Sequence, residues 1–291
     1  MSILLGVINE GLIYALMALG VYITYSILDF PDLSVDSTFP LGAAVTATLL
    51  LLGVPPVLTL PAAFAAGALA GMATGFIHVK LKVRDLLSGI IVMTALYSIN
   101  LRITGNKATL PIFSQETIFE NSFLDSLPPG LFDYSTILIL LVIVLAVKIL
   151  LDLYLETRSG YLLRAVGNNE TLVTSLAKDK GSVKILGLAL ANGLAALAGA
   201  VYCQQKGFFE ISIGTGTMVM GLASVIIGTR VFARFGKVKA TTAVILGTIV
   251  YKACISAAMA LGLQTLYMKL ITSLFFLIIL VVSENRKKKV R

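Results

Sequence analysis

The sequence is poor in the residues that enzymes and soluble domains depend on. Charged residues make up 13% of its 291 residues, against about 25% in typical soluble proteins. His78, the only histidine, stands alone at the end of an apolar run, so the sequence shows no Ser/His/Asp catalytic set, and the two cysteines, Cys203 and Cys254, form neither a CxxC motif nor a metal-ligand spacing. The GKVK segment at 236–239 fails the P-loop pattern, because no Ser or Thr follows the lysine. The residues therefore predict neither catalysis nor ATP binding in this chain.

Apolar residues are abundant and are grouped into long runs. They account for 57% of the chain, against roughly 45–50% in soluble domains. Runs of about 20 apolar residues are long enough to cross a bilayer. The pattern predicts an all-α polytopic membrane protein, with residues 1–291 forming a single transmembrane domain. Nine membrane-spanning helices are expected, at 3–28, 37–53, 57–79, 86–104, 134–155, 184–206, 216–233, 240–262 and 266–283.

The positions of the basic residues predict the orientation in the membrane. The segments 80–85, 156–184, 230–239 and 284–291 hold 17 of the 23 Lys and Arg residues, and none precedes Lys80. Positive residues collect on the cytoplasmic side, so we expect these four segments inside, the N-terminus outside and the C-terminus cytoplasmic. The net charge is +8, but the basic residues cluster in short segments beside apolar runs, so the charge predicts no nucleic-acid partner.

The stretch LDFPDLSVDSTF, residues 28–39, places Asp29, Asp32 and Asp36 between two apolar runs. A loop with three acids and no basic residue is unusual on the cytoplasmic side. One hypothesis is that the first helix breaks at Pro31 and that DLSVDS lies at membrane depth, where only protein or a water-filled cavity can satisfy its polar groups. An ordinary acidic loop at the membrane interface is the alternative, and the pattern alone leaves both open.

Lys252 lies near the middle of the span 240–262, about 15 Å from either end. A central lysine costs about 2.5–3.5 kcal/mol on insertion scales, so it should face a cavity or a carboxylate. Its candidate partners are Asp32, Asp36 and Glu10. Gln204 and Glu210 lie near the outer end of the predicted sixth span, and they either line an external vestibule or lie on an exposed rim. The predicted substrate pathway comprises Glu10, Asp32, Asp36, Gln204, Glu210 and Lys252.

The segment 156–184 is the longest polar stretch on the predicted inner side. Asn168 or Asn169 can cap a helix whose first turn carries Glu170. Its apolar residues, at positions 172, 173, 176 and 177, fall on one face. Such a helix either rests on lipid or docks into a groove of a soluble partner, and the spacing does not decide between the two.

A faint internal duplication is also visible. EGLIYALMALGVY, residues 10–22, resembles NGLAALAGAVY, residues 192–202, and each is followed by an irregular acidic stretch and a short Gly-containing span. The first four spans would then match the last four, with the fifth between them. A single intervening span makes the two halves inverted, which is a common transporter architecture.

Several segments resemble the permease subunits of ABC importers of the ribose and branched-chain amino acid type. They are FPDLSVDSTFPLGAAV, LLSGIIVMTALYSINLRITG, AVGNNETLVTSLAKDKGSVKILGLALANGLAALAGAVYCQQKGFFEISIGTGTMVMGLASVIIG and YKACISAAMALGLQTLYMKLIT. The sequence is most similar to the tryptophan/tyrosine-type permeases that work with a lipoprotein binding protein. Ser37 departs from the short residue, such as Gly, that the family has after the second aspartate.

The resemblance implies a transport subunit of the bacterial plasma membrane that is not an enzyme. It implies a homodimer, a cytoplasmic ABC ATPase dimer that carries ATP and Mg, and an extracellular substrate-binding lipoprotein. No cofactor is expected in this chain. An amino acid such as tryptophan or tyrosine is the expected substrate, with an ABC permease for a sugar or nucleoside, or an ion-coupled secondary transporter, as alternatives. The predicted ATPase contact within 156–184 comprises Arg164, Gly167, Asn168, Asn169 and Glu170.

Overall fold

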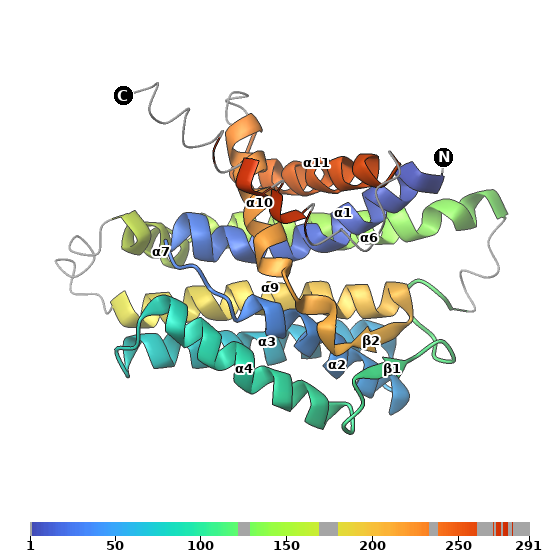
Figure 1. Cartoon of the computed structure of the whole chain (residues 1–291), viewed down its shortest axis with the longest axis horizontal. Coiled ribbons are helices and arrows are strands. Elements are labelled where there is room, and N and C mark those ends of the chain that lie inside the picture. Colours follow the sequence, from blue (N-terminus) through green and yellow to red (C-terminus); the bar gives the residue numbers. More distant parts are fainter. Residues whose placement is uncertain are drawn as a thin grey trace.

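A computed structural model of the chain describes residues 2–121, 129–168, 180–232 and 238–260, with a few helical positions between 270 and 281. Figure 1 shows a bundle of long helices, several of which run side by side. Its elements are α1 (Ser2–Val21), the π-helix η1 (Tyr22–Ile27), α2 (Val35–Leu51), α3 (Pro56–Val79), α4 (Asp85–Ile103), β1 (Thr109–Pro111), α6 (Pro129–Leu155), α7 (Arg158–Asn168), α9 (Lys180–Lys206), β2 (Phe208–Glu210), the 3-10 helix η2 (Ile211–Gly214), α10 (Thr217–Val231) and α11 (Ala240–Ala260).

Seven helices in the described part of the chain are long and apolar enough to cross a membrane. They are α1 with η1, α3, α4, α6, α9, η2 with α10, and α11, whereas α2 is apolar but has only 17 residues. Each of the first eight predicted spans corresponds to one of these helices, which confirms a polytopic, mostly helical membrane protein. The ninth, 266–283, lies mostly outside the described residues.

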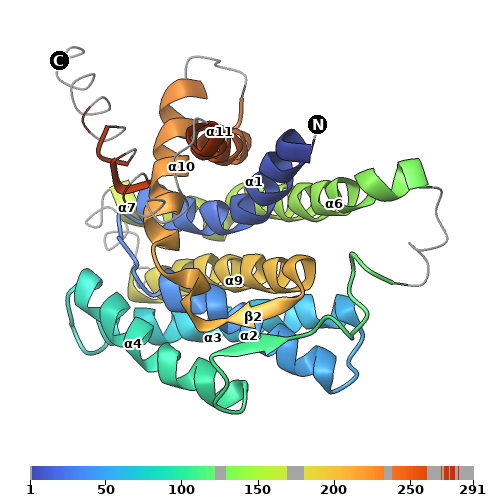
Figure 2. The same ribbon diagram turned by 45° about the vertical axis from the view of Figure 1, so that its right-hand side comes forward.

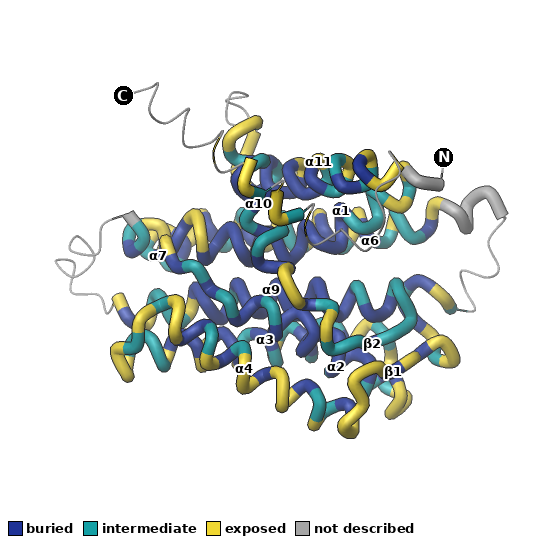
Figure 3. The backbone as a smooth tube through the Cα atoms, viewed as in Figure 1, coloured by how far each residue is buried: buried dark blue, intermediate teal, exposed yellow. Residues whose placement is uncertain are grey.

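Helix α9 forms the centre of the bundle. It packs against α1 on one side and against α2 and α3 on the other, while α11 covers the far side of α1 and α4 lies outermost beyond α2 and α3. Figure 2, turned by 45°, shows α10 still crossing the direction of the other helices. The helices differ widely in burial (Figure 3). In the most apolar stretch of the central helix α9, 78% of the residues are buried, whereas only 17% are buried in that of α6.

Glycines allow α2 and α3 to approach α9 closely. Gly67 and Gly71 lie one turn apart on α3, and a Cβ at either would meet backbone atoms of α9, around Asn192 and Leu188 respectively. On α2, a Cβ at Gly42 would meet the Ala196 carbonyl. Lipid gives helices no hydrophobic reason to associate, so small residues and close van der Waals packing hold such interfaces together.

A small antiparallel sheet joins the segments that follow α4 and α9. Strand β1 pairs with β2, with Leu110 opposite Phe209, and both side chains are buried. The sequence analysis expected only helices, because three-residue strands are too short to show a period of two.

Candidate functional site

The helix break around Asp32 lies inside the bundle. Helical structure stops at Ile27, before Pro31, and resumes at Val35. The side chain of Asp32 is fully buried, and its carboxylate accepts hydrogen bonds from the Ser34 N–H (2.9 Å) and from Asn192 Nδ2 (2.7 Å). Asp32 therefore lies in the interior of the protein, whereas Asp29 is exposed.

The depth of the break follows from its contact with α9. Asn192 lies 12 residues after the start of α9, which is about 18 Å along a helix, and is near its centre. Besides donating to Asp32, Asn192 accepts a hydrogen bond from the Ser34 hydroxyl (3.0 Å). The carboxylate of Asp32 and the amide of Asn192 thus satisfy polar groups of the break, including the Ser34 N–H, near the middle of a candidate span.

Asp36 caps the N-terminus of α10. Its carboxylate accepts hydrogen bonds from the Gly216 N–H (3.0 Å), the Met218 N–H (2.8 Å) and the Thr217 hydroxyl (3.1 Å). Gly216 has a φ of 85°, a left-handed conformation that suits glycine. The carboxylate thus faces the positive end of the helix dipole, so it serves α10 and does not pair with Lys252.

Replacing Asp36 with asparagine should destabilise the protein by about 1 kcal/mol, the scale of a lost helix cap and of a charge at a helix N-terminus. Asp29→Asn is the matched control, because Asp29 is exposed and has a φ of 52°, a conformation that asparagine tolerates. Melting temperatures in detergent measure the difference. Equal melting temperatures for the two variants would contradict the capping role.

Lys252 pairs with Glu10. Its Nζ lies 3.1 Å from Glu10 Oε2 and 4.0 Å from the centre of the Tyr14 ring, a cation–π position. Lys206 Nζ lies 3.2 Å from the other oxygen of Glu10. Of the three partners considered from sequence, Glu10 is confirmed and both aspartates are wrong, because helix α1, which carries Glu10, packs along α11.

This charged cluster opens into a cavity of about 660 Å³, within the range of roughly 300–1,000 Å³ typical of ligand pockets. Two of its lining residues, Asn9 and Gln205, have buried side-chain oxygens without a hydrogen-bond partner in the described part of the chain. The remaining walls come from η2, α10, α11 and the described residues beyond it. We call this space the Glu10–Lys252 pocket.

Two residues predicted for the pathway lie elsewhere. Gln204 is 2% exposed, and its amide donates to the Pro56 carbonyl (3.1 Å) and the Thr59 hydroxyl (2.9 Å), so it lies neither in a vestibule nor on a rim. Glu210 lies in β2, where its carboxylate accepts a hydrogen bond from the Ser212 hydroxyl. Asn9, Gln205 and Lys206 were not among the predicted pathway residues, although the polar pairs Asn9–Glu10 and Gln205–Lys206 inside apolar runs were a signal for them.

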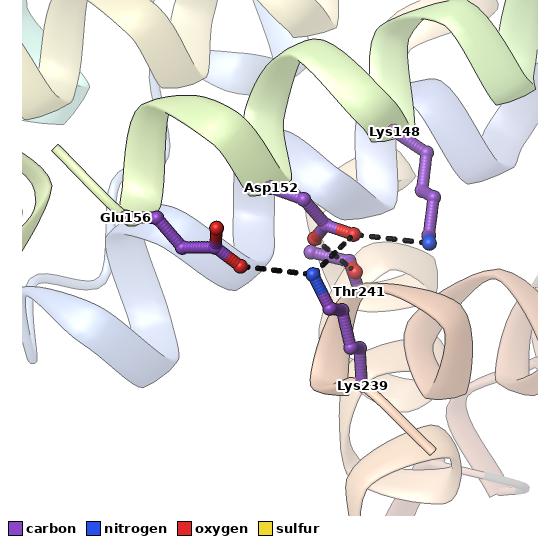
Figure 4. A network of polar contacts seen from close by, with 5 residues as sticks. All are labelled: Lys148, Asp152, Glu156, Lys239 and Thr241. Carbon is purple, nitrogen blue, oxygen red and sulfur yellow. Dashed lines mark hydrogen bonds and ion pairs between the residues drawn. The ribbon is translucent and has the colours of Figure 1, made fainter. Parts of the chain in front are cut away.

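A second polar cluster lies at the other end of the bundle, where α6 ends and α11 begins. Figure 4 shows Lys239 reaching between two carboxylates, that of Asp152 in the last turn of α6 (3.7 Å) and that of Glu156 just after the helix ends (2.9 Å). Asp152 also pairs with Lys148 (3.0 Å) and accepts a hydrogen bond from Thr241 (2.6 Å). The hydrogen bond to Glu156 and the charge of Asp152 raise the pKa of Lys239 above its ordinary value.

The predicted ATPase-contact residues fall partly in α7, a helix that the sequence analysis did not expect. Arg164 is exposed at the rim of a cavity of about 530 Å³ beside Lys239. Gly167 instead faces inward, where a Cβ would meet the Ile27 carbonyl at the end of η1. Asn168 ends α7, whereas Asn169, Glu170 and the helix predicted after them lie outside the described residues.

The comparisons with known proteins cover nearly the whole chain. The family described as branched-chain amino acid transport system / permease component matches residues 3–283. A tyrosine transport system permease protein of Clostridioides difficile (strain R20291) is 45% identical over 274 residues, covering 94% of this chain and 89% of the relative.

More distant relatives include a ribose import permease and a branched-chain amino acid permease. The ribose import permease protein RbsC of Escherichia coli (strain K12) is 25% identical over 98% of this chain and 86% of its own length. The probable branched-chain amino acid transport permease protein LivH of Methanocaldococcus jannaschii is 30% identical over 75% of this chain and 70% of its own length. No solved structure gives a significant match. The chain therefore belongs to the branched-chain amino acid transport system / permease component family of ABC-type membrane permeases.

Proposed function

We propose that the chain is the permease subunit of an ATP-driven importer for an amino acid such as tyrosine or tryptophan. The observation that carries this proposal is the 45% identity to a tyrosine transport system permease over 94% of the chain. A sugar is the second candidate, because ribose import permeases also match almost the full length at 25% identity. The permease provides the pathway, and ATP hydrolysis takes place on a partner.

The partners proposed are a second copy of this chain, a cytoplasmic ABC ATPase dimer that holds ATP and Mg, and an extracellular substrate-binding lipoprotein. The proposed orientation in a bacterial plasma membrane has the N-terminus outside and the C-terminus inside. A cysteine introduced at Ser2 should then react with a membrane-impermeant reagent in intact cells. Labelling that requires cell lysis would contradict this orientation.

An inverted repeat is the architecture that we propose for the spans. Helix α1 packs against α11, the third helix of the second half, and α9 packs against α3, the third helix of the first. The two matching glycines behave alike, since a Cβ at Gly11 would meet Ile249 and one at Gly193 would meet Phe64. The reciprocal contacts support the weak sequence duplication.

Under this orientation the Glu10–Lys252 pocket belongs to the external half of the pathway. Glu10 lies eight residues, or about 12 Å, after the start of α1, and Lys206 is the last residue of α9. Asp32 and Asp36 contribute by holding the break and the N-terminus of α10 that flank the pathway, without facing the lysine.

Arg164 should be part of the ATPase contact. Arg164→Glu reverses an exposed charge on α7 without opening the core, so we expect normal membrane insertion, ATP hydrolysis no longer coupled to transport, and at least a roughly tenfold loss of uptake, about 1.4 kcal/mol. Arg102→Glu is the control, since it reverses an exposed charge in the last turn of α4. Coupled uptake at the wild-type rate in Arg164→Glu would remove Arg164 from the contact.

The function itself is tested by reconstitution. Permease, ATPase and binding protein in vesicles should take up labelled L-tyrosine when ATP is supplied, and a protonophore should leave the rate unchanged. Uptake that collapses with the protonophore would favour the ion-coupled transporter instead. D-Ribose uptake without tyrosine uptake would favour the sugar permease.

A further inference from the structure

The Glu10–Lys252 pocket carries one more positive than negative charge. Among the described residues that line it, Lys206 and Lys252 are basic and Glu10 alone is acidic. The side chain of Lys252 is only 13% exposed, and a buried cation without full compensation is costly. The two lysines therefore favour a ligand group of negative charge, such as a carboxylate.

The N-terminus of α10 does not offer a competing anion site. Gly216 and Thr217 line the pocket, but the Gly216 N–H, the Met218 N–H and the Thr217 hydroxyl already donate to Asp36. The carboxylate of Asp36 therefore already compensates the positive end of the helix dipole. The two lysines remain the cationic groups that a ligand carboxylate can reach.

The same pocket also contains hydrogen-bond acceptors that lack donors. Asn9 Oδ1 and Gln205 Oε1 are buried atoms, and neither has a partner in the described part of the chain. Buried acceptors without partners are rare, because each has lost its hydrogen bonds to water without gaining another. An ammonium group, which carries three donors and no acceptor, is the kind of ligand group that such acceptors favour.

The opening of this pocket is not required by helix packing. The matching contact in the other half of the bundle is closed: where Lys252 follows Ile249 by three residues, Gly67 follows Phe64 by three, and a Cβ at Gly67 would meet Asn192. In the first half, Gly67 packs directly against α9 and leaves no space. In the second half, Lys252, Glu10 and the cavity occupy the corresponding place.

From these observations we infer that the pocket binds the zwitterionic main chain of a free α-amino acid. Lys206 and Lys252 take the carboxylate, while Asn9, Gln205 and Glu10 take the ammonium. The apolar wall, which includes Ile213, Met220, Ile255 and Met259, is left for the side chain. This inference rests on the proposed function, and it assigns recognition of the substrate to the permease itself and not only to the binding protein.

The test is equilibrium binding to the full-length permease in nanodiscs, without the binding protein. The probes are L-tyrosine, L-leucine, tyramine, 3-(4-hydroxyphenyl)propanoate and D-ribose. An amino acid should bind at least about tenfold more tightly than the analogues that lack a carboxylate or an ammonium, because a site built around both charges leaves one unpaired with either analogue. D-Ribose should not compete.

Two variants assign the charges to their residues. Lys252→Met should weaken the binding of L-tyrosine and of the propanoate at least about tenfold and should not weaken the binding of tyramine. Asn9→Leu should weaken the binding of L-tyrosine and tyramine and leave the propanoate unaffected. Lys206→Gln repeats the first test if Lys252→Met is poorly folded. Lys148→Met, at the other end of the bundle, is the control.

The outcomes separate this inference from the proposed function. Binding of L-leucine without L-tyrosine would support the zwitterion site and reject the aromatic substrate. Import that does not need ATP would reject the importer without touching the site. Binding of D-ribose alone, equal binding of tyramine and L-tyrosine, or no binding of any probe would overturn the inference.

Discussion

Gly42→Ala should destabilise the protein by about 1–3 kcal/mol or more, the scale of overpacking in a core. A Cβ at Gly42 would lie against the backbone carbonyl of Ala196, and a backbone atom of α9 cannot rotate aside as a side chain can. Relief requires that α2 move away from α9. That movement would also strain Asp32 and Asp36, which hold the start of α2 against α9 and α10.

Gly6→Ala is the control for this prediction. Both changes put alanine in place of glycine within a helix, which by itself favours the helix by about 1 kcal/mol. A Cβ at Gly6 meets nothing within 4 Å, so this variant should melt at the wild-type temperature or above. Melting temperatures in detergent and yields of folded protein compare the two. If both variants melt alike, the close approach of α2 to α9 does not exist.

Lys252→Met should reduce substrate uptake at least about tenfold, a loss of about 1.4 kcal/mol or more, while the melting temperature stays the same or rises. The change removes the insertion cost of a lysine near the centre of a span, so stability and transport should move in opposite directions. Glu10 keeps Lys206 as a partner and is not left as an isolated charge. Lys148→Met, which removes a lysine paired within α6, should leave uptake unchanged.

A double-mutant cycle separates the contact with Glu10 from the ones expected with the aspartates. The effects of Lys252→Met and Glu10→Gln on uptake should not add, because the two side chains touch. The effects of Lys252→Met and Asp36→Asn should add, since Asp36 belongs to α10. Wild-type uptake in Lys252→Met would remove this lysine from the pathway.

Hydropathy was sufficient to place eight helices within a few residues of their observed limits, since long apolar runs have one stable solution in a bilayer. The three aspartates between apolar runs marked the stretch 28–39 as unusual, but the pattern alone left open whether it is a break inside the bundle or an interfacial loop. The π-helix η1 carries no comparable signal. Its residues, YITYSI, are as apolar as a regular helix end, and the wider winding depends on the packing around it.

Partner choice was beyond the sequence. Lys252 had three acids to choose from, and only the packing of α1 along α11 decides for Glu10. Gln204 and Gln205 show the same limit. Neighbouring residues on a helix point in different directions, so one is buried against Thr59 and the other lines the pocket. Polar residues inside apolar spans therefore predict that a polar site exists, but they do not show which of these residues face it.

Gly167 places the backbone of α7 in direct contact with the end of η1. No side chain separates α7 from the Ile27 carbonyl, and Gly187 on α9 admits Leu163 and Leu28 at the same junction. Packed interiors are nearly incompressible and transmit strain. A displacement of α7 by a partner would therefore be transmitted to the end of η1, and the wider winding of this π-helix, with its i to i+5 step, gives the first helix a segment that can rewind in response.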